Sequence, residues 1–119
     1  MMDQPRKMSE MISEMAAYFI GAGKTAEDKH NRLTAACSAW NMACGSPEVR
    51  RQQLEQYVEG YRQNNSAISP SDLASVRKVM EALMERKLEL FPDDKRRIVR
   101  AEVVMVGNDY RIEVVSATL

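Results

Sequence analysis

The sequence predicts an α+β fold in which four helices are followed by a C-terminal antiparallel β-hairpin. Up to about Phe91, apolar residues recur every three or four positions, which is the period of an amphipathic helix. From Ile98 to Ala117 they alternate at every second position, which is the period of a strand with one buried face. Helix-start and helix-end signals divide the first part of the chain into four segments. The predicted helices cover about 6–20, 26–44, 47–63 and 70–90.

The first two predicted helices are bounded by glycines. Gly21 and Gly23 follow the first helix and Gly45 follows the second, and glycine readily takes the left-handed conformation that closes a helix. The second helix begins after Thr25, whose hydroxyl can cap the free N–H groups, and Asp28 stands where a carboxylate bonds back. One face of this helix carries a seam whose pattern repeats every seven residues. The members of the seam are His30, Leu33, Cys37, Trp40 and Cys44.

The third and fourth predicted helices begin with the same start signal. Each begins with a capping serine and a proline at the first helical position, at 46–47 and at 69–70. The third ends at 64–66, and Gly60 weakens its interior by about 1 kcal/mol relative to alanine. The fourth ends before Pro92 and is the most apolar, so we expect it to be the most buried. Its apolar face is formed by Leu73, Val76, Met80, Leu83 and Lys87.

The predicted strands, at about 97–106 and 110–117, are joined by a tight turn. If residues 108–109 form the turn, Glu102 lies opposite Val115. If residues 107–108 form it, Glu102 lies opposite Glu113, and this like-charge pair disfavours that register. Both registers predict the same apolar face. That face carries Val99, Ala101, Val103, Met105, Tyr110, Ile112 and Val114.

Length and composition predict a single domain over residues 1–119, with a helical part at 6–91 and the hairpin at 97–117. Apolar residues make up 45% and charged residues 29%, as in ordinary globular proteins. The 17 basic and 17 acidic residues give no net charge and hence no global attraction to nucleic acid or an anionic membrane. No stretch approaches the roughly 20 apolar residues that span a bilayer. The absence of a signal-peptide pattern and the presence of only two cysteines predict reduced thiols in the cytoplasm.

No motif predicts a catalytic, cofactor-binding or metal site. Residues 21–25 resemble the end of a phosphate-binding loop, but Tyr18 stands where that motif needs its first glycine, and a helix precedes the segment. His30, Cys37 and Cys44 are seven residues apart, which is about 10.5 Å along a helix axis, whereas zinc ligands lie about 2.0–2.3 Å from one ion. We therefore predict a protein that is not an enzyme and that binds no cofactor or metal.

The hairpin predicts a protein–protein interface. A two-stranded sheet is marginal in water, and its unpaired edges attract another chain. We expect a symmetric homodimer in which two hairpins form one four-stranded sheet, with the fourth helix contributing to the contact surface. The same surface is available to another protein partner. The candidate interface residues are Val104, Val106, Val115, Arg100 and Arg111.

Two alternative functions remain open from the sequence. The densest basic cluster lies at the entrance to the hairpin and predicts a nucleic-acid-associated regulator, although flanking acids and the zero net charge oppose it. Its members are Lys95, Arg96, Arg97 and Arg100. The second alternative is a small enzyme that uses only carboxylates and arginines, which requires a pocket with convergent polar groups.

Overall fold

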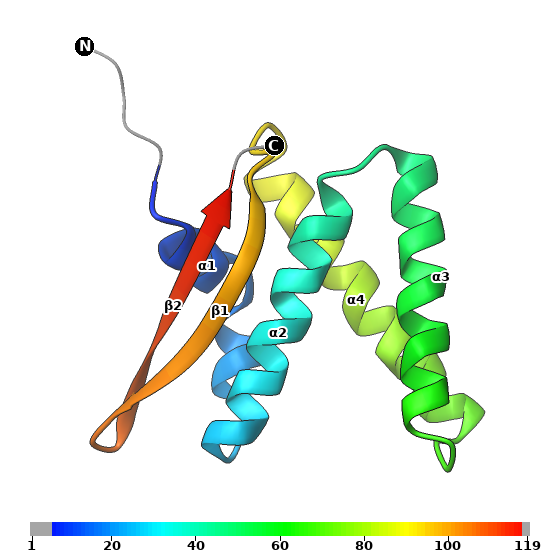
Figure 1. Ribbon diagram of the computed structural model, residues 1–119, viewed down its shortest axis with the longest axis horizontal. Helices are drawn as coiled ribbons and strands as arrows, with labels where there is room; N and C mark the ends of the chain where they lie inside the picture. Colours follow the sequence, from blue (N-terminus) through cyan, green and yellow to red (C-terminus); the bar gives the residue numbers. More distant parts are fainter. Residues whose placement is uncertain (1–5, 118–119) are drawn as a thin grey trace.

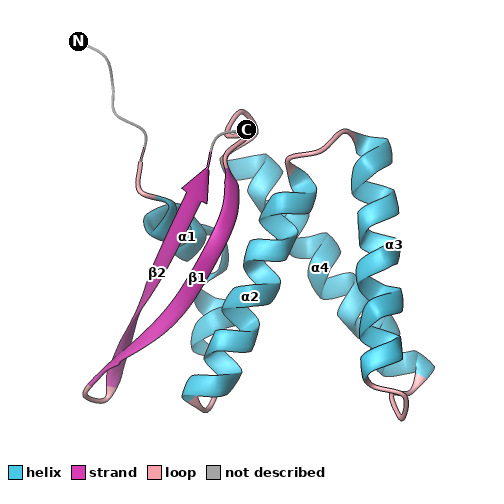
Figure 2. Ribbon diagram, viewed as in Figure 1, coloured by secondary structure: helices cyan, strands magenta, loops and turns pink. Residues whose placement is uncertain are grey.

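The computed structural model describes residues 6–117 and confirms the α+β class, with four helices followed by a two-stranded antiparallel sheet (Figures 1 and 2). The hairpin lies on one side of the molecule, α2 stands next to it, and α3 lies on the far side of α2 (Figure 1). In chain order the elements are α1 (Met8–Gly21), α2 (Ala26–Ala43), α3 (Pro47–Asn64), α4 (Pro70–Leu90), β1 (Arg97–Val106) and β2 (Asp109–Ala117).

Three of the four helices begin at the predicted capping residues. The hydroxyls of Thr25, Ser46 and Ser69 each accept a hydrogen bond from the backbone N–H three residues later, at 3.0–3.3 Å. Such bonds satisfy N–H groups that the first helical turn leaves without partners. Helix α1 begins at Met8, two residues later than predicted, and its preceding residue Lys7 makes no side-chain capping bond.

The core forms around α2, which corrects the expectation that the fourth helix is the most buried. Seven α2 side chains are buried, compared with four in α4. Helix α2 contacts all three other helices and β1, so it is enclosed on most sides. Within its predicted seam, Leu33, Cys37 and Trp40 are buried. His30 is exposed and Cys44 is half-buried, because the two ends of the seam lie near the ends of the helix.

Two polar side chains of α2 hold the start of β1. The indole Nε1 of Trp40 donates to the carbonyl of Arg96 at 2.8 Å. The Asn41 side chain makes two bonds to one residue: Oδ1 accepts from the Ile98 N–H at 2.8 Å, and Nδ2 donates to the Ile98 carbonyl at 2.9 Å. The Asn41 amide therefore satisfies both backbone groups of Ile98, as a neighbouring strand would.

The hairpin turns at Gly107 and Asn108, so Glu102 lies opposite Glu113. The like-charge argument disfavoured this register and was therefore wrong. Gly107 has a φ of 63°, in the left-handed region that glycine enters without steric cost, and glycine is favoured at the first central position of such a turn. The backbone requirement of the turn outweighs the repulsion of two exposed carboxylates, which is worth about 0.2–1 kcal/mol.

A β-bulge at Val99 changes the predicted apolar face. Ile98 pairs with Ser116 and Arg100 pairs with Val115, so Val99 has no partner in the ladder. An extra residue of this kind bends the strand and shifts which side chains face inward. Val99 is consequently 62% exposed, and Ile98 takes the buried place instead. The other hairpin residues that pack against the core are Ala101, Val103, Tyr110, Ile112 and Val114.

Lys87 is fully buried at the C-terminal end of α4. Its Nζ donates to the carbonyls of Phe91 and Asp94 at 2.8 Å and 2.6 Å, and it lies 4.9 Å from the centre of the Trp40 ring. These contacts fasten the loop between α4 and β1 to the core. Burial is the main factor that lowers the pKa of the Lys87 ammonium group from its ordinary value.

Replacing Gly60 by alanine should stabilise the protein by about 0.5–1 kcal/mol, because alanine is the better helix former and an added Cβ meets no atom within 4 Å. Thermal unfolding followed by circular dichroism measures the effect as a rise in Tm. Gly107→Ala is the matched control and should lower stability by about 1 kcal/mol, because a side chain at a φ of 63° is strained. Shifts of the same sign in both variants would contradict these backbone assignments.

The lowered pKa of Lys87 predicts a pH-dependent stability. Between the folded-state pKa and the ordinary lysine pKa, the unfolded chain binds more protons at this position than the folded chain, so the free energy of unfolding rises with pH. Lys87→Met removes this group at similar length. In urea titrations from about pH 7 to about pH 10, the stability of the wild type relative to Lys87→Met should rise. A constant or falling difference would show that burial does not disfavour the charged lysine.

Candidate functional site

The outer face of the hairpin is exposed along most of its length, and it holds all five predicted interface residues. Arg100 pairs with Val115 across the two strands, Val104 pairs with Arg111, and Val106 lies next to the turn. Val106 and Val115 are 53% and 48% exposed, both arginines are exposed, and Val104 is half-buried. The structure therefore brings the five residues together on one surface.

Helix α4 does not share this surface, although the sequence predicted that it would contribute to it. Helix α4 packs against α1, α2 and α3, whereas the two strands pack against α1 and α2 (Figure 2). Helix α2 consequently stands between the main body of α4 and the hairpin. The candidate interface is confined to the hairpin.

The turn determines which backbone groups lie at the edges of the hairpin. In an antiparallel pair, residues that exchange hydrogen bonds with each other alternate with residues whose N–H and C=O groups point outward. Val106 and Asp109 flank a two-residue turn, and a pair in this position exchanges hydrogen bonds. Counting from this pair, the outward groups belong to Ala101, Val103 and Met105 on β1 and to Tyr110, Ile112 and Val114 on β2.

Each strand has three residues with outward groups, and β2 presents the less obstructed edge because α2 packs against β1. The edge of β1 is interrupted near its start, where the bulge at Val99 bends the strand and the Asn41 amide occupies Ile98. Strand β2 lies on the side of β1 that faces away from α2 (Figure 1). Among residues 6–117, no hydrogen bond from outside the hairpin ladder reaches the outward groups of Ile112 and Val114, whereas the Tyr110 N–H bonds to Asp109 Oδ1 at 2.7 Å. An edge of this kind is a template for a strand from another chain.

Two carboxylates lie next to each other on the outer face of the hairpin. Glu102 lies directly opposite Glu113. Within the described part of the chain, the only guanidinium at ion-pair distance from either carboxylate is that of Arg111, 3.3 Å from Glu113 along the same strand. Both partners are at least half exposed, so this ion pair contributes about 0–1 kcal/mol. The predicted interface did not include Glu113, although the charge alternation at residues 111–113 was a visible signal.

The structure disperses the basic cluster at residues 95–100. The Arg96 guanidinium forms an ion pair with Asp94 at 2.7 Å, and both side chains are mostly buried. Hydrogen bonding to Arg96 is the main factor that lowers the pKa of the Asp94 carboxyl group. Lys95 and Arg100 are exposed, and Arg97 is half-buried. Arg96 therefore stabilises the turn before β1 instead of facing a ligand.

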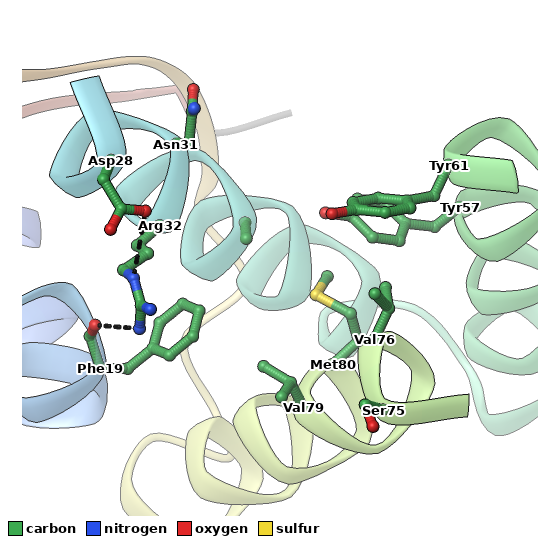
Figure 3. Close-up of a pocket in the computed structure, with 11 residues that line it drawn as sticks. Phe19, Asp28, Asn31, Arg32, Tyr57, Tyr61, Ser75, Val76, Val79 and Met80 are labelled. Atoms are coloured by element: carbon green, nitrogen blue, oxygen red, sulfur yellow. Dashed lines mark hydrogen bonds and ion pairs between the residues drawn. The ribbon is translucent and has the colours of Figure 1, made fainter. Parts of the chain in front are cut away.

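A groove of about 390 Å³ opens between α2 and α3 (Figure 3). Tyr57 and Tyr61 line it on the α3 side, and Phe19 and Arg32 line it on the opposite side (Figure 3). The floor consists of the α4 side chains Val76, Val79 and Met80. Arg32 bonds to Asp28 at 3.4 Å and to the Phe19 carbonyl at 3.0 Å, so both charged groups of the groove are engaged within the fold. The groove offers a mainly apolar and aromatic surface.

The histidine and the two cysteines occupy different environments. His30 is exposed, Cys37 is buried, and Cys44 is half-buried with its Sγ 3.6 Å from the Arg96 carbonyl. Burial raises the pKa of the Cys37 thiol to about 12, so this thiol stays protonated at neutral pH and is a poor nucleophile. Within residues 6–117, no group of three His, Cys, Asp or Glu side chains is placed to hold a metal ion.

The glycine-containing segment at residues 21–25 forms the junction between α1 and α2. Lys29 Nζ donates to the carbonyls of Gly21 and Gly23 and so occupies acceptors at the end of α1. A Cβ atom added at Gly23 would lie 2.8 Å from the backbone nitrogen of Lys29. Close packing of the segment on α2 therefore explains the glycine at position 23.

Comparison with known proteins identified no relative of this chain. The chain matches no protein-family model, no curated protein and no solved structure. Within residues 6–117, each helix is too short or too polar to cross a lipid bilayer. The features that bear on function are thus the open edge of β2, the exposed outer face of the hairpin and the groove between α2 and α3.

Proposed function

We propose that this chain is a non-catalytic cytosolic protein that acts through protein–protein contact at its hairpin, with a second copy of itself as the first partner. The observation that carries the proposal is the open edge of β2, where the backbone groups of Ile112 and Val114 have no partner among residues 6–117. A hairpin gains stability when further strands extend its sheet. The two free cysteines are compatible with a reducing compartment.

The protection of the two edges supports β2 as the contact strand. Natural sheets protect open edges with bulges, prolines or a covering element. Strand β1 has the bulge at Val99 and the covering amide of Asn41. Strand β2 runs from Asp109 to Ala117 without a proline and without a bulge of its own. This difference favours pairing through β2.

Exposed apolar side chains support a contact surface on the hairpin as a whole. Four large apolar residues of the hairpin are between 46% and 62% exposed. They are Val99, Met105 and Val106 on β1 and Val115 on β2. Two hairpins that pair through β2 would form a four-stranded sheet in the order β1-β2-β2-β1 around a two-fold axis.

The nucleic-acid alternative has less support. Arg96, at the centre of the basic cluster, is engaged with Asp94. The chain has no net charge, so only the local charges of Lys95, Arg97 and Arg100 remain to attract phosphates. We therefore retain protein contact as the proposed function.

Proline substitutions at the two edges test the proposal. Val114→Pro removes an outward N–H from the β2 edge, and Val103→Pro removes one from the β1 edge; both valines are half-buried, so the two variants lose similar packing. Light scattering at increasing concentration should show wild type and Val103→Pro rising from 13.5 kDa toward about twice that mass. Val114→Pro should associate at least about tenfold more weakly, because it interrupts the interface ladder.

Two results would overturn the proposal. One is a wild-type mass near 13.5 kDa at every concentration. The other is equal weakening by Val103→Pro and Val114→Pro, with both variants shown to be folded by circular dichroism. If Val114→Pro does not fold, the exposed charge variants described below replace it.

A further inference from the structure

We infer that the two copies pair in one register, with the two-fold axis between their Ile112 residues, so that Arg111 of each copy lies opposite Glu113 of the other. This inference rests on the proposed function, because it requires pairing through β2. It adds the alignment of the two β2 strands, which follows from the order of charges along the strand.

The hydrogen-bond pattern limits the possible registers. Outward backbone groups on β2 belong to every second residue, so a symmetric antiparallel pair places its axis at a residue. An axis at Arg111 sets arginine against arginine, and an axis at Glu113 sets glutamate against glutamate. An axis at Val114 sets Glu113 against Val115. An axis at Tyr110 sets Asp109 against Arg111 but aligns only residues 109–111 of each strand. An axis at Ile112 sets Arg111 against Glu113 twice, and among the longer overlaps it is the arrangement that pairs opposite charges.

This register also offsets a repulsion that each chain carries by itself. Glu102 and Glu113 lie opposite each other in the hairpin. With the axis at Ile112, Arg111 of the second copy lies on the other side of Glu113. Each pair of glutamates then has an additional guanidinium beside it in the four-stranded sheet. The like-charge register of the isolated hairpin becomes favourable in the dimer.

The remaining contacts of this register follow from the alternation of outward groups along β2. The two Ile112 residues exchange backbone hydrogen bonds at the axis, and the Tyr110 carbonyl of one copy accepts from the Val114 N–H of the other. The Tyr110 N–H exchanges its bond to Asp109 Oδ1 for the Val114 carbonyl of the other copy. These residues lie on the inner face of the hairpin, so the helices of both copies cover the same face of the sheet. The outer face continues across the axis with its alternating charges.

Strand β1 carries the same charge order but a poorer edge. Arg100 and Glu102 would pair if an axis lay at Ala101. That register continues into Ile98, whose backbone groups are bonded to Asn41, and into the bulge at Val99. The β1 charges therefore supply a matched control for the β2 charges.

Charge reversal tests the register. In Arg111→Glu both positions become acidic, and in Glu113→Arg both become basic, so each variant alone would place like charges together twice. Light scattering should show that each variant self-associates about tenfold or more weakly than wild type. An equimolar mixture should form a heterodimer, because both opposing pairs are then of opposite charge. The double variant Arg111→Glu/Glu113→Arg should recover self-association. All these side chains are at least half exposed, so the variants should fold.

The outcomes separate the register from the proposed function. The matched variant Arg100→Glu, whose position lies opposite Val115, should self-associate as wild type does, and mixing it with Glu102→Arg should give no preference for the heterodimer. A wild-type dimer with no recovery in the mixture, or with recovery only for the β1 pair, would overturn the register but leave protein contact through the hairpin standing. A wild type that stays monomeric would remove both.

Discussion

The contact between the Asn41 amide and the backbone of Ile98 is the constraint on which the rest of the structure depends. Its two hydrogen bonds, of 2.8 Å and 2.9 Å, attach the first strand to the central helix. They join residues 57 positions apart in the chain, so they fix long-range geometry that no local preference supplies. Because Asn41 covers the β1 edge at this point and α2 packs against β1, the less obstructed edge of the hairpin belongs to β2. The proposed function follows from that asymmetry.

The loop that leads into β1 is held by groups that would be costly to bury alone. Lys87 bonds to two carbonyls, Trp40 bonds to a third, and Arg96 pairs with Asp94. No buried side-chain nitrogen or oxygen among residues 6–117 lacks a partner. Such a network is stable because every member is satisfied, and it gives the hairpin one position. The same network uses Arg96 in the fold and so leaves less positive charge for a ligand.

Much of this fold was predictable from local signals. Capping residues and prolines mark the starts of three helices, and the change of apolar period marks the hairpin. The features that were not predictable depend on contacts between distant segments. The bulge at Val99 follows from the fit of β1 on α2, and the burial of Lys87 follows from carbonyls in a loop beyond its helix. The register was misjudged because the turn preference of Gly107 outweighs one weak charge pair.

The residues of the candidate site were predictable from the sequence, but the strand edge that is open was not. Alternation along the strands placed the five candidate interface residues on one face, as the structure has them. The sequence did not show which edge is open, because that depends on Asn41 and on the bulge. It also joined the fourth helix to this surface, whereas α2 stands between them.

Amide hydrogen exchange of Ile112 and Val114, compared at low and high protein concentration, tests the central claim most directly. Their N–H groups point outward from β2 and have no partner in the single chain, as described for residues 6–117. The account predicts that both amides become protected as concentration rises, while the outward amide of Val103 on β1 exchanges at an unchanged rate. Fast exchange of Ile112 and Val114 at every concentration, or protection of Val103 in their place, would contradict it.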